Sequence, residues 1–417
     1  MKVSSMLDDG GCIFVLALGL SASTMAAPLP LTGVNIAGGE FWWSGRATAH
    51  PQYGLNYSYP TKAEIEYFAA QGMNVFRYAF RWETLQPTVR TPLDQPDLAR
   101  LKESVKWATS RKLVVLLDPH NYARYGTNIV GGAIVSGADF ADFWQRLAVE
   151  FKADPYVWFG LVNEPHHLPT QQWFDAANAC IAAIRDSGSK NLILVPGNRW
   201  TGAQSWTNGG DQSSAKCVLS VKDPLDYWVV EVHMYLDSDS SGTKKSVVSP
   251  TIGAERLKQF VKWCRQHKMR AVLGEFGVPV VPEGEETLHN TLKSMEADSD
   301  VWLGWTWWAA GARWNKQYMF DIEPRNGQDR PQMAWLQPHL YGAKMPQFTI
   351  AVKNGTGQGE AEAGALQTIQ AGPAPAGMVF RKWTGDIAWL TDANSPNTMV
   401  CVPFKNIAVE AFFEKAP

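Results

Sequence analysis

The sequence carries little charge, and neither sign of charge predominates. Charged residues make up 19% of its 417 positions, with 38 Lys and Arg against 40 Asp and Glu and a formal net charge of -2. Proteins that bind nucleic acids or anionic membranes need a basic face, so this balance argues against both partners. A hydrophobic content of 45% also excludes a disordered chain. We therefore predict a folded protein with an uncharged partner, built as one large domain with a smaller one or a tail.

Cysteine is scarce as well, and the apolar run from Cys12 to Leu20 is too short to span a bilayer. With Lys2 before it and small residues after it, this run is typical of a secretory signal peptide over residues 1–27. We therefore expect a secreted or periplasmic protein. Once such a leader is removed, the remaining cysteines allow one disulfide, which their spacing does not assign. They are Cys180, Cys217, Cys264 and Cys401.

Tryptophan, by contrast, is abundant, with 19 residues. Core packing accounts for more than half of them, but exposed indole faces are also what sugar rings stack against. Several tryptophans lie in loops that follow predicted strands, and we expect about half of these to form sugar subsites. They are Trp42, Trp43, Trp173, Trp200 and Trp206.

Between Leu31 and about Leu340, short apolar runs alternate with amphipathic helical stretches, which is typical of a parallel sheet with crossover helices. Strands are predicted at residues 33–37, 75–80, 114–118, 157–162, 192–195, 228–232, 271–274 and 303–307. Helices are predicted between them, at residues 62–71, 97–111, 138–152, 171–187 and 254–267. Eight strands favour an α/β fold of the (β/α)8 or TIM-barrel type over residues 28–343, with a doubly wound sheet as the alternative.

The composition changes beyond Tyr341, where Gly, Ala, Thr and Val dominate and turn signals such as Asn354-Gly355 separate short strands. We predict a small all-β module at residues 347–417. Its pattern resembles the bacterial repeat modules that are appended to secreted proteins. Trp383 and Trp389 are candidates for glycan binding, but a structural or spacer role is favoured.

Polar residues recur where the predicted strands end, and in a barrel these ends meet at one face. Asn163 and Glu164 follow the run 157–162, and Glu275 follows the run 271–274. Each candidate is weak by itself, because a strand-end residue such as Asp118 is more often a hydrogen-bonding brace. The ordered set predicts one active site. Its other members are Arg77, His120, Asn121, His233, Tyr235 and either Trp307 or Trp308.

A pair of carboxyl groups, one protonated and one ionised, is the minimum for cleaving a glycosidic bond. Arg77 and the Tyr235 hydroxyl are suited to keep Glu275 ionised, whereas the neutral Asn163 amide beside Glu164 lets Glu164 keep its proton. Carboxyl groups about 5 to 5.5 Å apart form a covalent intermediate with retention of configuration, and a gap of about 6.5 to 9.5 Å admits water and gives inversion. The sequence leaves both outcomes open.

These residues resemble glycoside hydrolase family 5, and within it the endo-β-1,4-glucanases called cellulases. The resemblance covers about residues 31–340 and implies the TIM-barrel fold. Seven motifs carry it in order, at residues 33–40 (GVNIAGGE), 74–77 (NVFR), 118–122 (DPHNY), 157–166 (VWFGLVNEPH), 232–239 (VHMYLDSD), 273–277 (LGEFG) and 307–311 (WWAAG).

The resemblance implies a retaining mechanism on cellulose or soluble β-glucan, with Glu164 as acid/base and Glu275 as nucleophile. Asn163 would hydrogen-bond the sugar 2-hydroxyl, and Trp308 would form a stacking floor, with Trp307 as its rival. The other implied substrate-binding residues are Arg77, His120, His233 and Tyr235. No cofactor is implied.

Several alternatives use the same residues. Mannan, β-1,3-glucan or mixed-linkage glucan is an alternative substrate, and transglycosylation is an alternative outcome. A glycan-binding protein without turnover would need a missing carboxylate, and both are present. A monomer is the default for a long open cleft, and no metal is expected, because His166 and His167 lack a third ligand at useful spacing. The acidic loop at Asp237 and Asp239 is interpreted as solvated rather than as a calcium site.

Overall fold

The structure is a computed structural model that describes residues 26–42 and 51–416. The predicted signal peptide therefore lies outside the described residues, apart from its last two positions, and so does Trp43. None of the helices in the described part of the chain combines the length and the apolar character needed to cross a bilayer.

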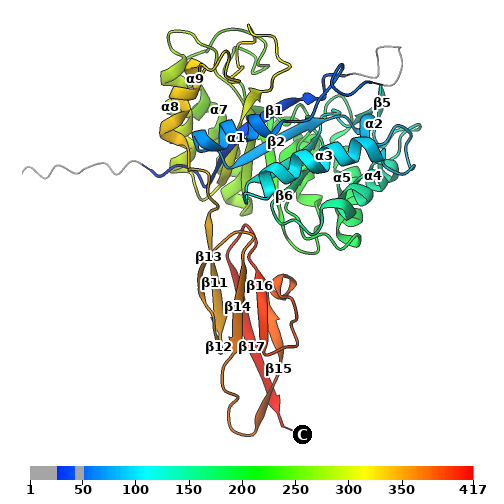
Figure 1. The fold of residues 1–417 in the computed structure, drawn as a ribbon, viewed down its shortest axis with the longest axis vertical. Coiled ribbons are helices and arrows are strands. Elements are labelled where there is room, and N and C mark those ends of the chain that lie inside the picture. Colours follow the sequence, from blue (N-terminus) through cyan, green and yellow to red (C-terminus); the bar gives the residue numbers. More distant parts are fainter. Residues whose placement is uncertain (1–25, 43–50, 417) are drawn as a thin grey trace, which may run out of the picture.

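Eight parallel strands close into a barrel in the order β1-β10-β9-β8-β7-β6-β3-β2 (Figure 1). Closure is complete because β1 pairs with both β10 and β2. All eight predicted strands are present, so the barrel prediction is confirmed and the doubly wound alternative is wrong. The strands are β1 (Leu31–Gly39), β2 (Val75–Phe80), β3 (Val114–Pro119), β6 (Val157–Gly160), β7 (Ile193–Pro196), β8 (Trp228–His233), β9 (Ala271–Phe276) and β10 (Trp302–Ala310).

Capping side chains determine where several outer helices begin. Thr61 and Glu64 form a capping box at the start of α1, and Ser136 and Asp139 form one at the start of α4. The five predicted helices are present, each starting and ending within two residues of its predicted bounds. Helix α8 was not among the predicted helices, and it has no side-chain cap. The α-helices are α1 (Lys62–Gln71), α2 (Trp82–Leu85), α3 (Gln95–Thr109), α4 (Gly137–Phe151), α5 (Thr170–Asp186), α6 (Ser214–Cys217), α7 (Ile252–His267), α8 (Gly284–Ala297) and α9 (Pro331–Leu336), and a short hairpin joins β4 (Arg124–Tyr125) to β5 (Asn128–Ile129).

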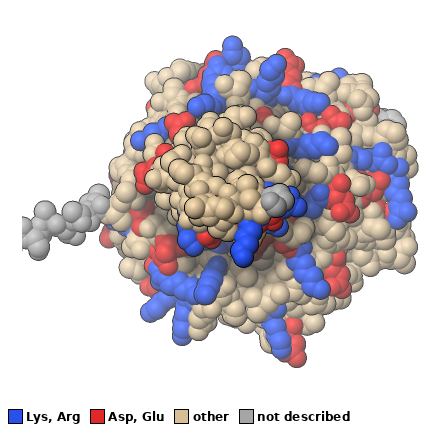
Figure 2. Space-filling model, turned by 90° about the horizontal axis from the view of Figure 1, so that it is seen from below, with Lys and Arg blue, Asp and Glu red and all other residues tan. Residues whose placement is uncertain are grey.

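A β-rich module follows the barrel and extends from one end of it (Figure 1). It has two sheets, in the orders β13-β11-β17-β15 and β12-β14-β16. Its strands are β11 (Gln347–Lys353), β12 (Gly355–Thr356), β13 (Gly359–Glu362), β14 (Leu366–Ala371), β15 (Met378–Gly385), β16 (Asn397–Cys401) and β17 (Ile407–Lys415). Seen from the module end, Lys and Arg are interspersed with Asp and Glu on the barrel surface around it (Figure 2).

The module packs on the N-terminal ends of the barrel strands. Tyr227, which directly precedes β8, shares one buried apolar cluster with Trp389 and Phe404 of the module. The Tyr227 hydroxyl accepts a hydrogen bond from the backbone N–H of Phe404 at 2.7 Å. Both module tryptophans, Trp383 and Trp389, are buried, so they pack and do not present a glycan-binding face. The C-terminal ends of the strands therefore point away from the module.

The four cysteines downstream of the leader are all free, so the described residues contain no disulfide. Cys180, Cys217 and Cys264 are buried and Cys401 is half-buried. Burial raises the pKa of the Cys180 thiol well above its ordinary value, which keeps it protonated and unreactive.

We expect Tyr227→Phe to lower the free energy of unfolding by about 1–3 kcal/mol, because it leaves the buried Phe404 N–H without its acceptor. Thermal or denaturant unfolding measures the change. The control is Lys112→Ala, which removes an exposed ion pair to Glu362 (3.1 Å) across the same junction and should cost less than about 1 kcal/mol. Equal effects of the two substitutions would contradict this account of the docking.

Candidate active site

The eight predicted site residues meet at the C-terminal ends of the barrel strands, remote from the module. They come from β2, β8, β9 and β10 and from the loops that follow β3, β6 and β8. Each touches at least one other through a hydrogen bond or a ring contact. They are Arg77, His120, Asn163, Glu164, His233, Tyr235, Glu275 and Trp308.

Arg77 organises this end of the barrel. Its side chain is fully buried and donates to Glu275 Oε1, Asn163 Oδ1 and Glu231 Oε1, each at 2.9 Å. Its Nη1 also lies 3.0 Å from Asp118 Oδ2. Burial lowers the pKa of Arg77, but the surrounding carboxylates outweigh burial and raise it, so the guanidinium stays charged. One cation thus holds three acidic residues and the Asn163 amide in fixed positions.

Glu275 has a donor on each carboxylate oxygen. Arg77 donates to Oε1, and the Tyr235 hydroxyl donates to Oε2 at 2.8 Å. Burial raises the pKa of Glu275, while the nearby His233 and Arg77 cations oppose that rise. The two donors favour the ionised form of Glu275, as predicted from the sequence, and burial opposes them.

Glu164 projects into the cleft from a left-handed backbone conformation, with φ of 42°. Non-glycine residues rarely adopt this conformation, and it clusters at functional sites. Its carboxylate faces Glu275 such that one oxygen of each residue lies within 4.8 Å of the other. This spacing suits direct attack by one carboxylate and is too short to place a water between a sugar and the attacking group.

His233 lies between the two glutamates. Its Nδ1 is 2.8 Å from Glu164 Oε1 and 3.5 Å from Glu275 Oε2. Burial lowers the pKa of His233, but Glu275, Glu164 and Glu231 outweigh it and raise the pKa to about 10. The imidazole is therefore protonated at neutral pH and has no lone pair for a metal. Glu164, His233 and Glu275 have the spacing of metal ligands, yet this charge distribution favours an ion-pair network.

The raised pKa of His233 makes the stability of the folded protein depend on pH in a defined direction. Because its folded pKa of about 10 exceeds the ordinary value of 6.5, the stabilisation is fully present below pH 6.5 and is lost as the pH rises through about 10. We expect the thermal midpoint to fall more between pH 7 and pH 10 in the unsubstituted protein than in His233→Gln. His267→Gln, at an exposed histidine, is the control and should keep the parent profile. Parallel profiles for His233→Gln and the parent would contradict the assignment.

His120 is held in one tautomer. Burial lowers the pKa of His120 to about 3, so its ring is neutral. Its Nδ1–H donates to Asp118 Oδ2 at 2.8 Å, and its Nε2 accepts from the Asn163 amide at 3.0 Å. Asp118 thus braces His120 and Arg77, as the sequence analysis favoured. The brace also orients the Asn163 amide beside Glu164.

Trp308, rather than Trp307, faces the cleft. Trp307 is fully buried and donates to a backbone carbonyl in the core, whereas Trp308 lines a cavity of about 660 Å³ together with Glu275. The Trp308 ring stacks on His120 with ring centroids 5.3 Å apart. Its indole N–H donates to the Tyr318 hydroxyl at 2.9 Å, which fixes the plane of the ring.

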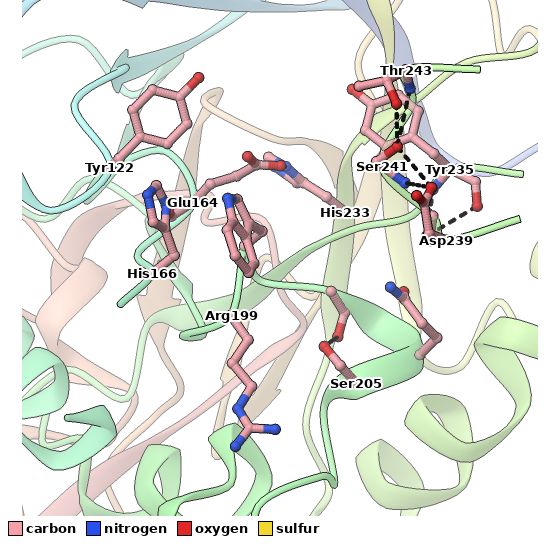
Figure 3. A pocket seen from close by; sticks show the side chains of 14 residues that line it. Tyr122, Glu164, His166, Arg199, Ser205, His233, Tyr235, Asp239, Ser241 and Thr243 are labelled. Atoms are coloured by element: carbon pink, nitrogen blue, oxygen red, sulfur yellow. Dashed lines mark hydrogen bonds and ion pairs between the residues drawn. The ribbon is translucent and has the colours of Figure 1, made fainter. Parts of the chain in front are cut away.

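A second cavity, of about 900 Å³, adjoins the first and shares Glu164, Tyr122 and Tyr235 with it. In this cavity the side chains of Glu164 and His233 meet at the centre, with Tyr122 and His166 on one side and Asp239, Ser241 and Thr243 on the other (Figure 3). Trp200 lines the same cavity and stacks on His166 at 4.7 Å. The cleft therefore extends on both sides of Glu164.

Three features of the site escaped the sequence analysis. Glu231 lies inside the apolar strand β8, where a single carboxylate among valines was the available signal. Tyr122 was noted only as part of a motif, yet it lines both cavities. The loop acid Asp237 is buried and hydrogen-bonded, so its interpretation as solvated is wrong.

The other strand-end tryptophans divide between core and cleft. Trp173 and Trp206 are buried in the core, so neither belongs to the half that was expected to form sugar subsites. Trp42 packs partly buried against the core, and Trp200 is the exposed one among those described.

Comparison with known proteins relates this arrangement to a family. A family model described as cellulase (glycosyl hydrolase family 5) matches residues 33–311. The chain belongs to glycosyl hydrolase family 5. Members of this family are retaining glycosidases, so the chain is a glycoside hydrolase. A second model, the divergent InlB B-repeat domain, matches residues 348–417, which confirms the predicted resemblance of the module to bacterial repeats.

Relatives within family 5 cover nearly the whole barrel. Endo-beta-1,4-glucanase A of Emericella nidulans is 38% identical over 317 residues, which is 75% of this chain and 93% of that protein. The structure of XacCel5A with cellopentaose is 44% identical with a TM-score of 0.72, over 75% of this chain and 99% of that one. Pseudomonas stutzeri endoglucanase Cel5A, solved with cellobiose, is 33% identical with a TM-score of 0.68, over 76% and 94%.

Proposed function

We propose that this hydrolase cuts internal β-1,4-glucosidic bonds of cellulose or soluble β-glucan with retention of configuration. The observation that carries the proposal is the approach of Glu164 and Glu275 to within 4.8 Å at the centre of a two-sided cleft. So close an approach favours retention, for which carboxyl groups lie about 5 to 5.5 Å apart, over inversion, which needs about 6.5 to 9.5 Å. The relatives named as endo-β-1,4-glucanases support the choice of linkage.

In the first step, the Glu275 carboxylate attacks the anomeric carbon while the bond from that carbon to the glycosidic oxygen breaks. Glu164 donates its proton to the departing oxygen, so the leaving sugar departs as an alcohol. In the second step, a water attacks the same carbon and gives its proton to Glu164, and the Glu275 ester bond breaks. Two inversions restore the original configuration, and both carboxyl groups return to their starting states.

The neighbouring side chains have distinct tasks in these steps. Arg77 and Tyr235 hold the two oxygens of Glu275 in position for attack. Protonated His233 donates from Nδ1 to Glu164 Oε1 at 2.8 Å and so orients the carboxyl group of the acid. Asn163 would donate to the sugar 2-hydroxyl, a contact that strengthens in the transition state.

Aromatic faces would hold the polysaccharide on both sides of the cleaved bond. Trp308, stacked on His120, supplies the floor beside Glu275, and exposed Trp200, stacked on His166, supplies a face on the other side. Because the cleft continues past Glu164 in both directions, a chain can lie through it, which favours cleavage at internal bonds. His120 and His233 would border the sugar next to the cleaved bond.

We also propose that the enzyme works as a monomer outside the cytoplasm, without a metal or cofactor. The signal-like residues 1–27 and a polymeric substrate support export, and the two carboxyl groups complete the reaction by themselves. The catalytic domain would span residues 28–343 and the accessory module residues 347–417.

Release of reducing ends by the purified protein tests the substrate. Carboxymethylcellulose and barley β-glucan should be cut, with a rapid early fall in viscosity that marks internal cleavage, while mannan, xylan and laminarin should be poor substrates. Release from mannan or laminarin instead would keep the mechanism and replace the sugar. With cellopentaose, products longer than the substrate would indicate transglycosylation, and inactivity on all substrates would overturn the proposal.

A further inference from the structure

The loop that follows β8, residues 237–244, packs behind the residues that hold Glu275. It also borders both cavities of the cleft through Ser241 and Thr243. We propose that Asp237 is a positioning residue, which orients Glu275 by folding this loop against Tyr235. The inference rests on the proposed role of Glu275 as nucleophile, and Asp237 itself contacts no reacting group.

Asp237 is the organising acceptor of the loop. It is only 2% exposed, although the polar residues Ser238, Asp239 and Ser240 follow it in the sequence. Its Oδ1 accepts the N–H of Gly242 at 3.1 Å, and its Oδ2 accepts the N–H groups of Thr243 and Lys244, both at 3.2 Å. The Ser241 hydroxyl shares its one hydrogen between Oδ2, at 3.0 Å, and Asp239 Oδ1, at 2.8 Å. All four partners are donors, so the loop requires an acceptor on both oxygens.

The folded loop presses its backbone against the Tyr235 ring. Gly242 has φ of 68°, and a Cβ placed on it would lie 2.7 to 2.9 Å from three atoms of that ring. Ser240 adds a second link, because its hydroxyl accepts the Tyr235 N–H at 3.1 Å and donates to the Tyr235 carbonyl at 3.0 Å. Only glycine allows the backbone to approach the ring this closely.

The position of Tyr235 directly affects the position of Glu275. Its hydroxyl donates to Glu275 Oε2, and its ring stacks on Phe320 with centroids 5.6 Å apart. Arg256 of α7 donates to the carbonyls of Tyr235 and Asp237, which ties the start of the loop to the barrel. A displaced loop would thus move the Tyr235 hydroxyl away from Glu275, and a misplacement of about 1 Å at a reacting group costs about 100-fold in rate.

The rate at which Glu275 becomes covalently labelled measures its positioning directly. The probe is a 2-deoxy-2-fluoro-cellobioside with an activated leaving group, which needs no acid and leaves its sugar on the nucleophile, where peptide mass spectrometry locates it. We expect Asp237→Asn to slow labelling about 10- to 100-fold, because one oxygen becomes an NH2 group that faces donors. Gly242→Ala should slow it similarly through the ring contact.

The matched control is Asp223→Asn. The Asp223 side chain is also buried and accepts the N–H groups of Leu225 (3.1 Å) and Tyr227 (2.9 Å), but it lies at the module end of the barrel. Its substitution should lower the thermal midpoint and leave the labelling rate of the folded protein unchanged. Equal slowing by Asp223→Asn and Asp237→Asn would reduce the role of Asp237 to stability and overturn the proposal.

A double substitution isolates the path through Tyr235. Tyr235→Phe removes the hydroxyl that connects the loop to Glu275, so adding Asp237→Asn to it should slow labelling less than about 3-fold further. The proposal would be overturned if the double variant slowed labelling by the product of the two single-variant factors. Parent-like labelling rates in Asp237→Asn and Gly242→Ala would also overturn it. If the unsubstituted protein carries no label on Glu275, the proposed function itself fails, so the two failures are distinguishable.

Discussion

The Glu275→Ala protein is expected to fold normally and to lose its turnover of barley β-glucan by a factor of about 10⁴ or more. Without the carboxylate no covalent intermediate forms, so the first step of the double displacement is lost. The fold should survive because Arg77 keeps Glu231 at 2.9 Å and Asp118 at 3.0 Å. Reducing-end assays and circular dichroism measure the two properties.

The Glu164→Gln protein is the matched comparison. It keeps the nucleophile and loses the acid, so its rate on polysaccharide should fall by a factor of about 10² to 10⁴. An aryl cellobioside with a good leaving group needs no acid for its first step, so that step should recover in Glu164→Gln and not in Glu275→Ala. Recovery in Glu275→Ala would reverse the two roles. Substantial polysaccharide turnover in either variant would contradict the assignment of both residues as catalytic.

Arg77→Lys should be the most damaging substitution that keeps the charge. The guanidinium contacts Glu275, Asn163, Glu231 and Asp118 from three nitrogens, whereas an ammonium is a point charge with a different shape. Some of the buried carboxylates would then lose their cationic partner. Breaking a buried ion pair lowers the free energy of unfolding by about 3 to 5 kcal/mol. We expect that loss in denaturant unfolding, together with a loss of about 10³-fold or more in kcat/KM.

Arg185→Lys separates the loss of stability from the loss of positioning. Arg185 is also buried and pairs with Asp223 at 2.8 Å, but it lies at the opposite end of the barrel. Its substitution should destabilise the protein and leave the kcat of the folded enzyme close to that of the parent. Retention of more than about a tenth of the activity by Arg77→Lys would contradict the positioning role, since a 1 Å misplacement alone costs more.

The barrel could be predicted from the sequence because buried parallel strands are short apolar runs on both faces, and that pattern is local. The site followed from it, since residues such as Asn163 and Glu164 come directly after a strand whose end must face the cleft. The choice between Trp307 and Trp308 could not be made from the local sequence pattern. Neighbouring residues of a strand point to opposite sides, and only the three-dimensional register determines which side faces the cleft.

Other features depend on contacts between distant parts of the chain. The burial of Glu275 and its effect on the pKa arise from β2 and β8, which pack around it from elsewhere in the sequence. Asp237 resembled a solvated loop residue because the sequence contains no signal that four donors would turn back onto its carboxylate. Trp389 was a candidate for glycan binding, although a structural role was favoured, and its packing with Tyr227 of the barrel accounts for it as a structural residue.

The placement of the β module determines which end of the enzyme remains available to a polymer. The module covers the N-terminal ends of the strands, and β17 carries the chain toward its far tip, where the C-terminus lies (Figure 1). A bead, an electrode or a second enzyme fused beyond Lys415 would therefore be attached on the side of the molecule opposite the cleft. Immobilised in this way, the enzyme would face outward, with the module as a built-in spacer between the catalyst and its support.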